Sequence, residues 1–187
     1  MSSGPFKVLD QEHDQIRIML DLLRVLVVQV EERPIMRWLS PARSAVDWLE
    51  TYNISHHRKE EKVLELLQEK GLANGELARF WKDHEQGELV FEHLGKALEA
   101  LRLGKSASRP KVKRLFEVLL AKYGEHMEGE EEILFPAARM ALTKEDRERL
   151  TSKFAEVERE MFRLSSELRL KAVAKAIKGG FPPAEEA

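Results

Sequence analysis

Long stretches with the apolar periodicity of helices, separated by short breaks, restrict the fold of this chain more than any other feature. In the first stretch, about residues 6–32, Ile16, Leu20 and Leu23 recur at intervals of three and four residues. This spacing places them on one face of an α-helix. Pro34 is expected to end or bend this helix, because proline disrupts a helix interior. The pattern predicts an all-α protein.

Similar signals predict four further helices. Ser40-Pro41 reads as a cap followed by a proline at the first helical position, and Gly71 as a C-terminal glycine. Thr143 and Asp146 form a capping-box pattern at the start of the last helix. Long helices with short loops form up-down-up-down bundles. We therefore expect a four-helix bundle over residues 1–142, an additional C-terminal helix over 143–178 and a disordered tail over 179–187.

Composition excludes several classes of protein and site. The 187 residues include no cysteine, so disulfides, iron–sulfur clusters and thiolate zinc sites are ruled out. A formal net charge of −2, with acids and bases interleaved, gives no basic surface for nucleic acid. The longest apolar stretch, residues 22–30, is too short to cross a membrane, and no secretory signal is visible. We expect a cytoplasmic protein that binds neither nucleic acid nor membrane.

Two histidine-containing segments occur twice in the chain. The segment around His13 is repeated around His84, with acids on both sides of the histidine and a glutamine two residues later. The segment that starts at His56 is repeated at His126, each copy reading His-x-x-x-Glu-Glu. The offsets between the copies are 71 and 70 residues. Two matches at nearly one offset indicate a duplicated helical hairpin and predict a pseudo-two-fold axis between the two halves.

The repeated segments contain the ligands of a metal site. Residues at i and i+4 share a helix face, so the carboxylate of each His-x-x-x-Glu should lie beside its histidine. Four helices would then bring together four imidazoles and two carboxylates, the ligand set of a dinuclear site inside a bundle. Bridging carboxylates and open coordination positions favour iron or manganese. The candidate metal ligands are His13, His56, Glu60, His84, Glu88, His126 and Glu130.

Glu88 and His57 are the less certain members of this region. Glu88 lies four residues after His84, so we expect it to point into the same space as an additional ligand. His57 follows His56 and should lie about 100° around the helix from it. We therefore expect His57 behind the ligands or at the surface, with ligation as the alternative.

Residues around the second His-x-x-x-Glu copy have supporting roles in this interpretation. Glu131, like its counterpart Glu61, is expected to accept a hydrogen bond behind the ligands or to be solvated. Tyr123 lies one turn before His126 and is expected to pack in the core, with a hydrogen-bonding role in the pocket as the alternative. Pro136 should free the carbonyl of Glu132 and kink the helix just past the site.

The segment from His126 to Pro136, His-Met-Glu-Gly-Glu-Glu-Glu-Ile-Leu-Phe-Pro, resembles the hemerythrin-like (HHE cation-binding) family, whose mark is His-x-x-x-Glu-Glu followed by Leu-Phe-Pro. The first copy keeps His56 and Glu60 but lacks the Phe-Pro. The resemblance covers about residues 8–142. It implies a four-helix bundle around two non-haem irons bridged by an oxo or hydroxo group, with zinc or manganese as substitutes. It further implies that the ligands are His13 and His56 for one iron, His84 and His126 for the other, and Glu60 and Glu130 as bridges.

The sequence departs from the oxygen-carrying members of that family at two places. Their third helix has His-x-x-x-His, where this chain has Glu88 in the second place. Their fourth helix has His-x-x-x-x-Asp, where this chain has His126-x-x-x-Glu130. A more anionic site stabilises the ferric state, which disfavours reversible O2 carriage. The resemblance thus predicts binding of O2, peroxide or NO in a sensing or protective role.

Two alternatives belong to other classes of function. One is an iron-binding or iron-donating protein in iron homeostasis or iron–sulfur repair. The other is a non-catalytic helical bundle that recruits a partner. The charged C-terminal helix over 143–178 is expected to be solvated on one side, with a homodimer or partner surface as the alternative.

Overall fold

The computed structural model describes residues 4–72 and 75–161, and these residues contain helices and no strand. The predicted all-α class is confirmed. Short 3₁₀ and π-helical turns, η1 and η2, precede and follow the fourth long helix. The elements are α1 (Pro5–Glu32), α2 (Ile35–Glu69), α3 (Arg79–Arg102), η1 (Ser106–Ser108), α4 (Arg109–Gly129), η2 (Glu130–Leu134), α5 (Phe135–Ala141) and α6 (Lys144–Met161).

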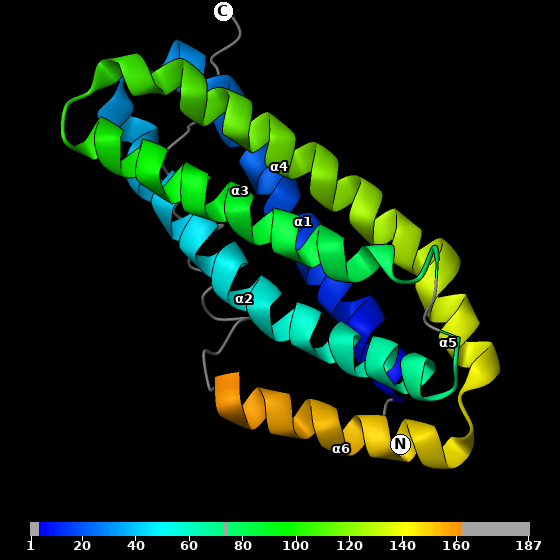
Figure 1. Ribbon diagram of the computed structural model, residues 1–187. Helices are drawn as coiled ribbons and strands as arrows, with labels where there is room; N and C mark the ends of the chain where they lie inside the picture. Colours follow the sequence, from blue (N-terminus) through cyan, green and yellow to red (C-terminus); the bar gives the residue numbers. More distant parts are fainter. Residues whose placement is uncertain (1–3, 73–74, 162–187) are drawn as a thin grey trace, which may run out of the picture.

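The four longest helices lie side by side, and successive helices run in opposite directions (Figure 1). Helix α1 packs against α2 and α4, and α3 packs against the same two helices. Helix α6 returns across α2 and also contacts α1. No described helix combines the length and apolar composition needed to span a bilayer.

The apolar core consists of two clusters separated by a polar layer. One cluster includes Ile16 and Val90, and the other includes Leu9 and Phe80. On α1 and on α3 a buried histidine lies between the residues of the two clusters. Burying polar groups in the middle of a core is costly unless they are paired. The layer between the clusters is therefore the part of the fold that needs a specific explanation.

The helix boundaries differ from expectation at the second helix. Helix α2 begins at Ile35, directly after Pro34, and Pro41 lies inside it rather than at its start. The non-helical backbone of Pro34 sets the start, and Pro41 is accommodated at the cost of one backbone hydrogen bond. Gly71 and Gly104 end their helices with φ of 73° and 82°, the left-handed conformation that glycine adopts without strain.

The fourth predicted helix is interrupted at the site rather than only beyond it. A π-helical turn runs from Glu130 to Leu134, and the Phe135 N–H bonds to the carbonyl of Glu130. Pro136 follows this turn and has no N–H to continue the α-helical pattern. Single π-helical turns are frequent at functional sites. The turn begins at Glu130, which the sequence predicts to be a metal ligand.

The start of α6 confirms the predicted capping box. The Thr143 N–H donates to Asp146 Oδ2 (2.9 Å), and the Asp146 N–H donates to Thr143 Oγ1 (3.2 Å). The structure describes this helix as far as Met161. The rest of the predicted C-terminal helix and the predicted disordered tail lie outside the described residues.

Candidate metal centre

The polar layer between the two clusters is a convergence of histidine and glutamate side chains from four helices. His13 comes from α1, His56 and Glu60 from α2, and His84 from α3. His126 lies in the last turn of α4, and Glu130 begins the π-helical turn. All are buried except His126, which is slightly exposed. The structure thus brings together six of the seven residues predicted as ligands, which are His13, His56, Glu60, His84, His126 and Glu130.

The Glu60 carboxylate lies between two pairs of imidazoles. Its Oε1 is 2.8 Å from His56 Nε2 and 3.4 Å from His13 Nε2. Its Oε2 is 3.4 Å from His84 Nε2. Each oxygen therefore faces a different pair of histidines.

The Glu130 carboxylate repeats this arrangement from the opposite side. Its Oε2 is 3.3 Å from His13 Nε2. Its Oε1 is 3.2 Å from His126 Nε2 and 3.7 Å from His84 Nε2. Each of the two buried carboxylates thus directs one oxygen toward the pair His13 and His56 and the other toward the pair His84 and His126. The arrangement offers two positions for a metal ion.

The inward-facing atoms of this cluster lie within ion-pair distance of one another but make no hydrogen bonds of good geometry. They are the Nε2 atoms of the four histidines and both carboxylate oxygens of Glu60 and Glu130. Buried polar atoms are almost always paired, and each unpaired one costs free energy. Imidazole nitrogens and carboxylate oxygens are ligands that divalent transition metals accept. A bound cation would satisfy these atoms together, so the residues fit a metal.

The outward-facing nitrogens are held by acidic side chains. His13 Nδ1 is 2.8 Å from Glu131 Oε1, and His56 Nδ1 is 2.9 Å from Glu12 Oε2. A histidine that donates from Nδ1 keeps its Nε2 lone pair free for a metal. Glu131 therefore lies behind His13 as an acceptor, as the sequence predicted for it.

The second half repeats these contacts at longer distances. His84 Nδ1 is 3.6 Å from Glu61 Oε1, and His126 Nδ1 is 4.0 Å from Asp83 Oδ2. Glu12 and Asp83 each directly precede a lone histidine of the repeat. The pairing therefore follows the duplicated register of the sequence.

Two buried or half-buried basic side chains, both from the first half of the repeat, form ion pairs with the acids that contact His13 and His56. Arg17 donates to both oxygens of Glu131, each at 2.6 Å. Lys59 is 2% exposed and donates to Glu12 and, at 2.9 Å, to Glu158 of α6. A continuous chain of polar contacts thus leads from α6 through Lys59 and Glu12 to His56.

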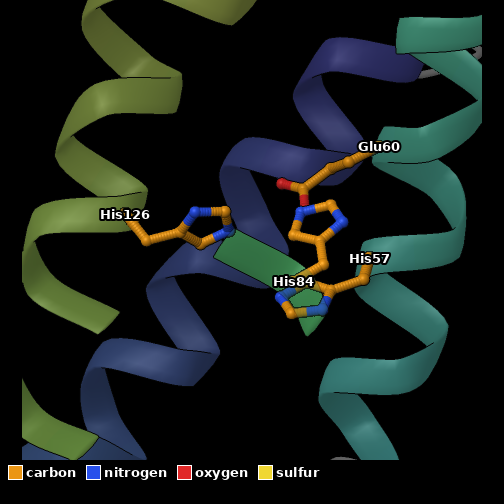
Figure 2. Close-up of side chains that lie close together, drawn as sticks. All are labelled: His57, Glu60, His84 and His126. Atoms are coloured by element: carbon orange, nitrogen blue, oxygen red, sulfur yellow. The ribbon is translucent and has the colours of Figure 1, made fainter. Parts of the chain in front are cut away.

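His57 was not among the predicted ligands, yet it lies at the cluster. It is buried and, together with Glu60, His84 and His126, forms a group able to hold a metal ion (Figure 2). Its ring stacks on His84, with centroids 3.8 Å apart and planes 9° apart. A metal binds in the plane of an imidazole, so one ion cannot lie in both of these parallel planes. We therefore regard His57 as a neighbour of His84 and His126 rather than as a third imidazole that would bind the same ion.

Glu88 does not lie where the sequence predicted. It is exposed, and neither group of potential metal ligands contains it. The buried face of this part of α3 consists of His84, Gly87, Val90 and Phe91. Glu88 falls beside that face, toward solvent. The i+4 rule correctly placed Glu60 and Glu130 but not Glu88.

Nearby charges determine the protonation of the metal-free cluster. Burial lowers the pKa of His13 and His84, but the adjacent carboxylates of Glu130 and Glu60 outweigh it and raise these pKa values to about 10 and about 11. For His56, burial is likewise outweighed, by Glu60 and Glu12, and the pKa rises to about 9. Burial would raise the pKa of Glu60, but the surrounding histidines hold it well below its usual range. Protons thus occupy the cluster when no metal does.

These pKa values predict how pH affects the metal-free chain. Histidine in an unfolded chain has a pKa of about 6.5, so the stability contributed by His13, His56 and His84 is fully present below about pH 6.5. It is lost as pH rises through the folded-state values of about 9 to about 11. Glu60 contributes stability above about pH 4.5, which is lost as pH falls toward its depressed pKa. We expect the free energy of unfolding of chelator-treated protein, measured in urea, to fall as pH rises from about 7 to about 10.

Metal should reverse this dependence, because metal and protons compete for the same nitrogens. The iron-loaded chain should keep or gain stability over the same pH range, and loading should release protons that an unbuffered titration detects. Equal pH profiles for the metal-free and loaded chain would contradict the assignment of these histidines.

The fold and this cluster define an all-α protein whose long helices carry inward histidines and glutamates compatible with metal binding. The family model described as hemerythrin HHE cation-binding domain matches residues 4–138. The match covers most of the chain, so the chain belongs to this family, and the predicted resemblance is confirmed. Comparisons with curated proteins and with solved structures found no match.

Proposed function

We propose that this protein is a dinuclear non-haem iron protein of the hemerythrin-like type, in which α1–α4 form an up-down four-helix bundle around the metals. His13 and His56 hold the first metal position. His84 and His126 hold the second metal position. Glu60 and Glu130 bridge the two.

The observation that carries the proposal is the placement of the two buried carboxylates. Glu60 and Glu130 each present one oxygen to each histidine pair, and none of these oxygens has a hydrogen-bond partner. A simple ion pair would need only one histidine for each carboxylate. Two cations between the pairs account for both features.

Iron bound at such a site supplies redox chemistry and open coordination positions for a small ligand. The chain orients the imidazoles through Glu12 and Glu131, keeps the centre buried and supplies the two negative charges that the metals require. On this basis we propose binding of O2, peroxide or NO in a sensing or protective role, inside the cell. Zinc or manganese would occupy the same donor atoms as substitutes.

Metal analysis tests this proposal directly. The metal-free full chain is titrated with ferrous iron under anaerobic conditions, desalted, and analysed for iron per chain by plasma emission spectrometry. We expect saturation at about two ions per chain, as in other carboxylate-bridged helical bundles. Oxidation of the loaded chain should then produce near-ultraviolet absorption. Saturation at one ion, or no retained iron, would contradict the dinuclear assignment.

A further inference from the structure

Helix α6 is held on the bundle by little apolar surface. Its described residues are strongly charged, and those that are buried are Leu150, Phe154 and Val157. A helix with few buried apolar contacts belongs to the part of a protein that opens most easily. The helix runs antiparallel to α2 (Figure 1). Ion pairs between described residues join the two helices: Arg149 with Glu69, Lys153 with Glu65, Lys59 with Glu158 and Arg58 with Glu160.

Lys59 is the buried side chain among these ion pairs. The basic side chains of the other pairs between α6 and α2 are all partly exposed. The Lys59 ammonium group donates to Glu158 of α6 at 2.9 Å and to Glu12 of α1. Burying a charge without partners is costly, so both contacts are needed to keep the ammonium group at this position. Lys59 therefore connects α6 to α1 through the interior of the contact.

The two oxygens of the Glu12 carboxylate have different partners. Oε1 accepts from Lys59, and Oε2 lies 2.9 Å from His56 Nδ1. While Lys59 holds one oxygen, the carboxylate keeps its other oxygen on the histidine. An acceptor at Nδ1 fixes the orientation of the ring and leaves Nε2 to face the metal. The position of α6 therefore affects the orientation of a candidate metal ligand.

Among the described residues, the second half of the repeat has no equivalent of this connection. Lys59 corresponds to Gly129, which has no side chain to donate. Glu12 corresponds to Asp83, whose Oδ2 lies 4.0 Å from His126 Nδ1, beyond hydrogen-bond distance. The duplication alone therefore does not explain the connection, which is specific to the half of the bundle that α6 covers.

We propose that α6 braces the first metal position through Glu158, Lys59 and Glu12, and that a metal bound there in turn holds α6 on the bundle. The inference rests on the proposed function, since the metal would be held by His13 and His56. Coupling between two sites acts equally in both directions. Whatever factor the docking of α6 adds to metal affinity, bound metal therefore adds to the docking of α6.

Hydrogen–deuterium exchange of the full chain tests the inference. The metal-free chain and the chain loaded with ferrous iron under anaerobic conditions are compared at the backbone amides of α6. A helix that opens by itself exchanges through that local opening, which metal slows only if the opening weakens metal binding. Coupling between sites typically amounts to about 5- to 150-fold, so iron should slow the exchange of α6 by about fivefold or more.

Two substitutions on α6 separate the brace from general stabilisation by iron. Glu158→Gln removes the charge that holds Lys59. Glu160→Gln is the matched control, because it removes the same charge from a pair with Arg58, which is 48% exposed. Both glutamates are themselves more than half exposed, so the variants should fold. Iron per chain is measured first, and the affinity for ferrous iron is then obtained by competition with a chelator.

The expected result is full iron content at saturation in every chain. Glu158→Gln should lose most of the iron-dependent slowing at α6 and bind iron about two- to fivefold more weakly, the range for a partly exposed ion pair. Glu160→Gln should match the unmodified chain. Equal behaviour of the two variants, or no slowing at α6 in a chain that binds two irons, would overturn the inference and leave the proposed function standing. Failure of the unmodified chain to retain iron would overturn both.

Discussion

Glu60→Gln is expected to reduce the iron content of the loaded chain to one ion or none per chain while its helix content survives. Two cations held close together in a buried, low-dielectric site repel each other strongly. Four neutral imidazoles cannot offset that repulsion, so anionic ligands must lie between the metals. Glutamine keeps the shape of the side chain but removes one of the two negative charges. Glu130→Gln should have the same effect, and metal analysis with circular dichroism measures both.

The controls for this prediction are Glu61→Gln and Glu131→Gln. Each of these acids is one residue further along its helix and contacts the outer nitrogen of a histidine rather than the inward one. Loss of such a supporting acid weakens metal affinity by about 10- to 100-fold but leaves the ligands in place. At saturating iron both variants should therefore keep their full metal content. If they lose metal while Glu60→Gln keeps it, the assigned helix faces are wrong by one position.

Lys59→Met is expected to lower the free energy of unfolding by about 3 kcal/mol, because removing one partner of a buried ion pair leaves an uncompensated charge. Lys59 is 2% exposed and joins Glu12 to Glu158, so its loss affects both a half-buried acid and the docking of α6. Urea unfolding of the metal-free chain measures the effect without interference from iron.

Arg149→Met is the matched control, because Arg149 also joins α6 to α2, through Glu69. Both side chains are half exposed, at 51% and 50%. Exposed ion pairs contribute about 0–1 kcal/mol, so this variant should lose much less stability. Equal losses in the two variants would mean that burial of Lys59 has no special importance.

The sequence predicted much of the cluster because its evidence was repeated. A single His-x-x-x-Glu is a weak signal, but the match of His56 and Glu60 to His126 and Glu130 fixed which helix faces meet. The lone histidines followed from the same offset. The rule that residues four apart share a helix face was sufficient here, because all four helices direct the repeated residues toward the polar layer of the core.

Other features depend on packing that no local pattern contains. His57 lies about 100° from His56 on α2 and still reaches the cluster, because its ring stacks on a histidine of another helix. Its mismatch with Met127 in the repeat was the one signal that could have drawn attention to it. The prediction for Glu88 was wrong for the converse reason. The rotation of α3 about its axis is set by the neighbouring helices, and the spacing of His84 and Glu88 does not determine it. The π-helical turn that begins at Glu130 was likewise not predicted, because Pro136 by itself indicates only a kink beyond the site.

The covalent connection between the two hairpins has a consequence for how such a centre can specialise. In a dimer of identical hairpins every substitution would occur twice, so space opened near one metal would also be opened near the other. With both hairpins in one polypeptide, glycine can occupy position 87 while isoleucine remains at position 16. The two halves can then differ in the space beside their histidines, an asymmetry that identical subunits cannot have.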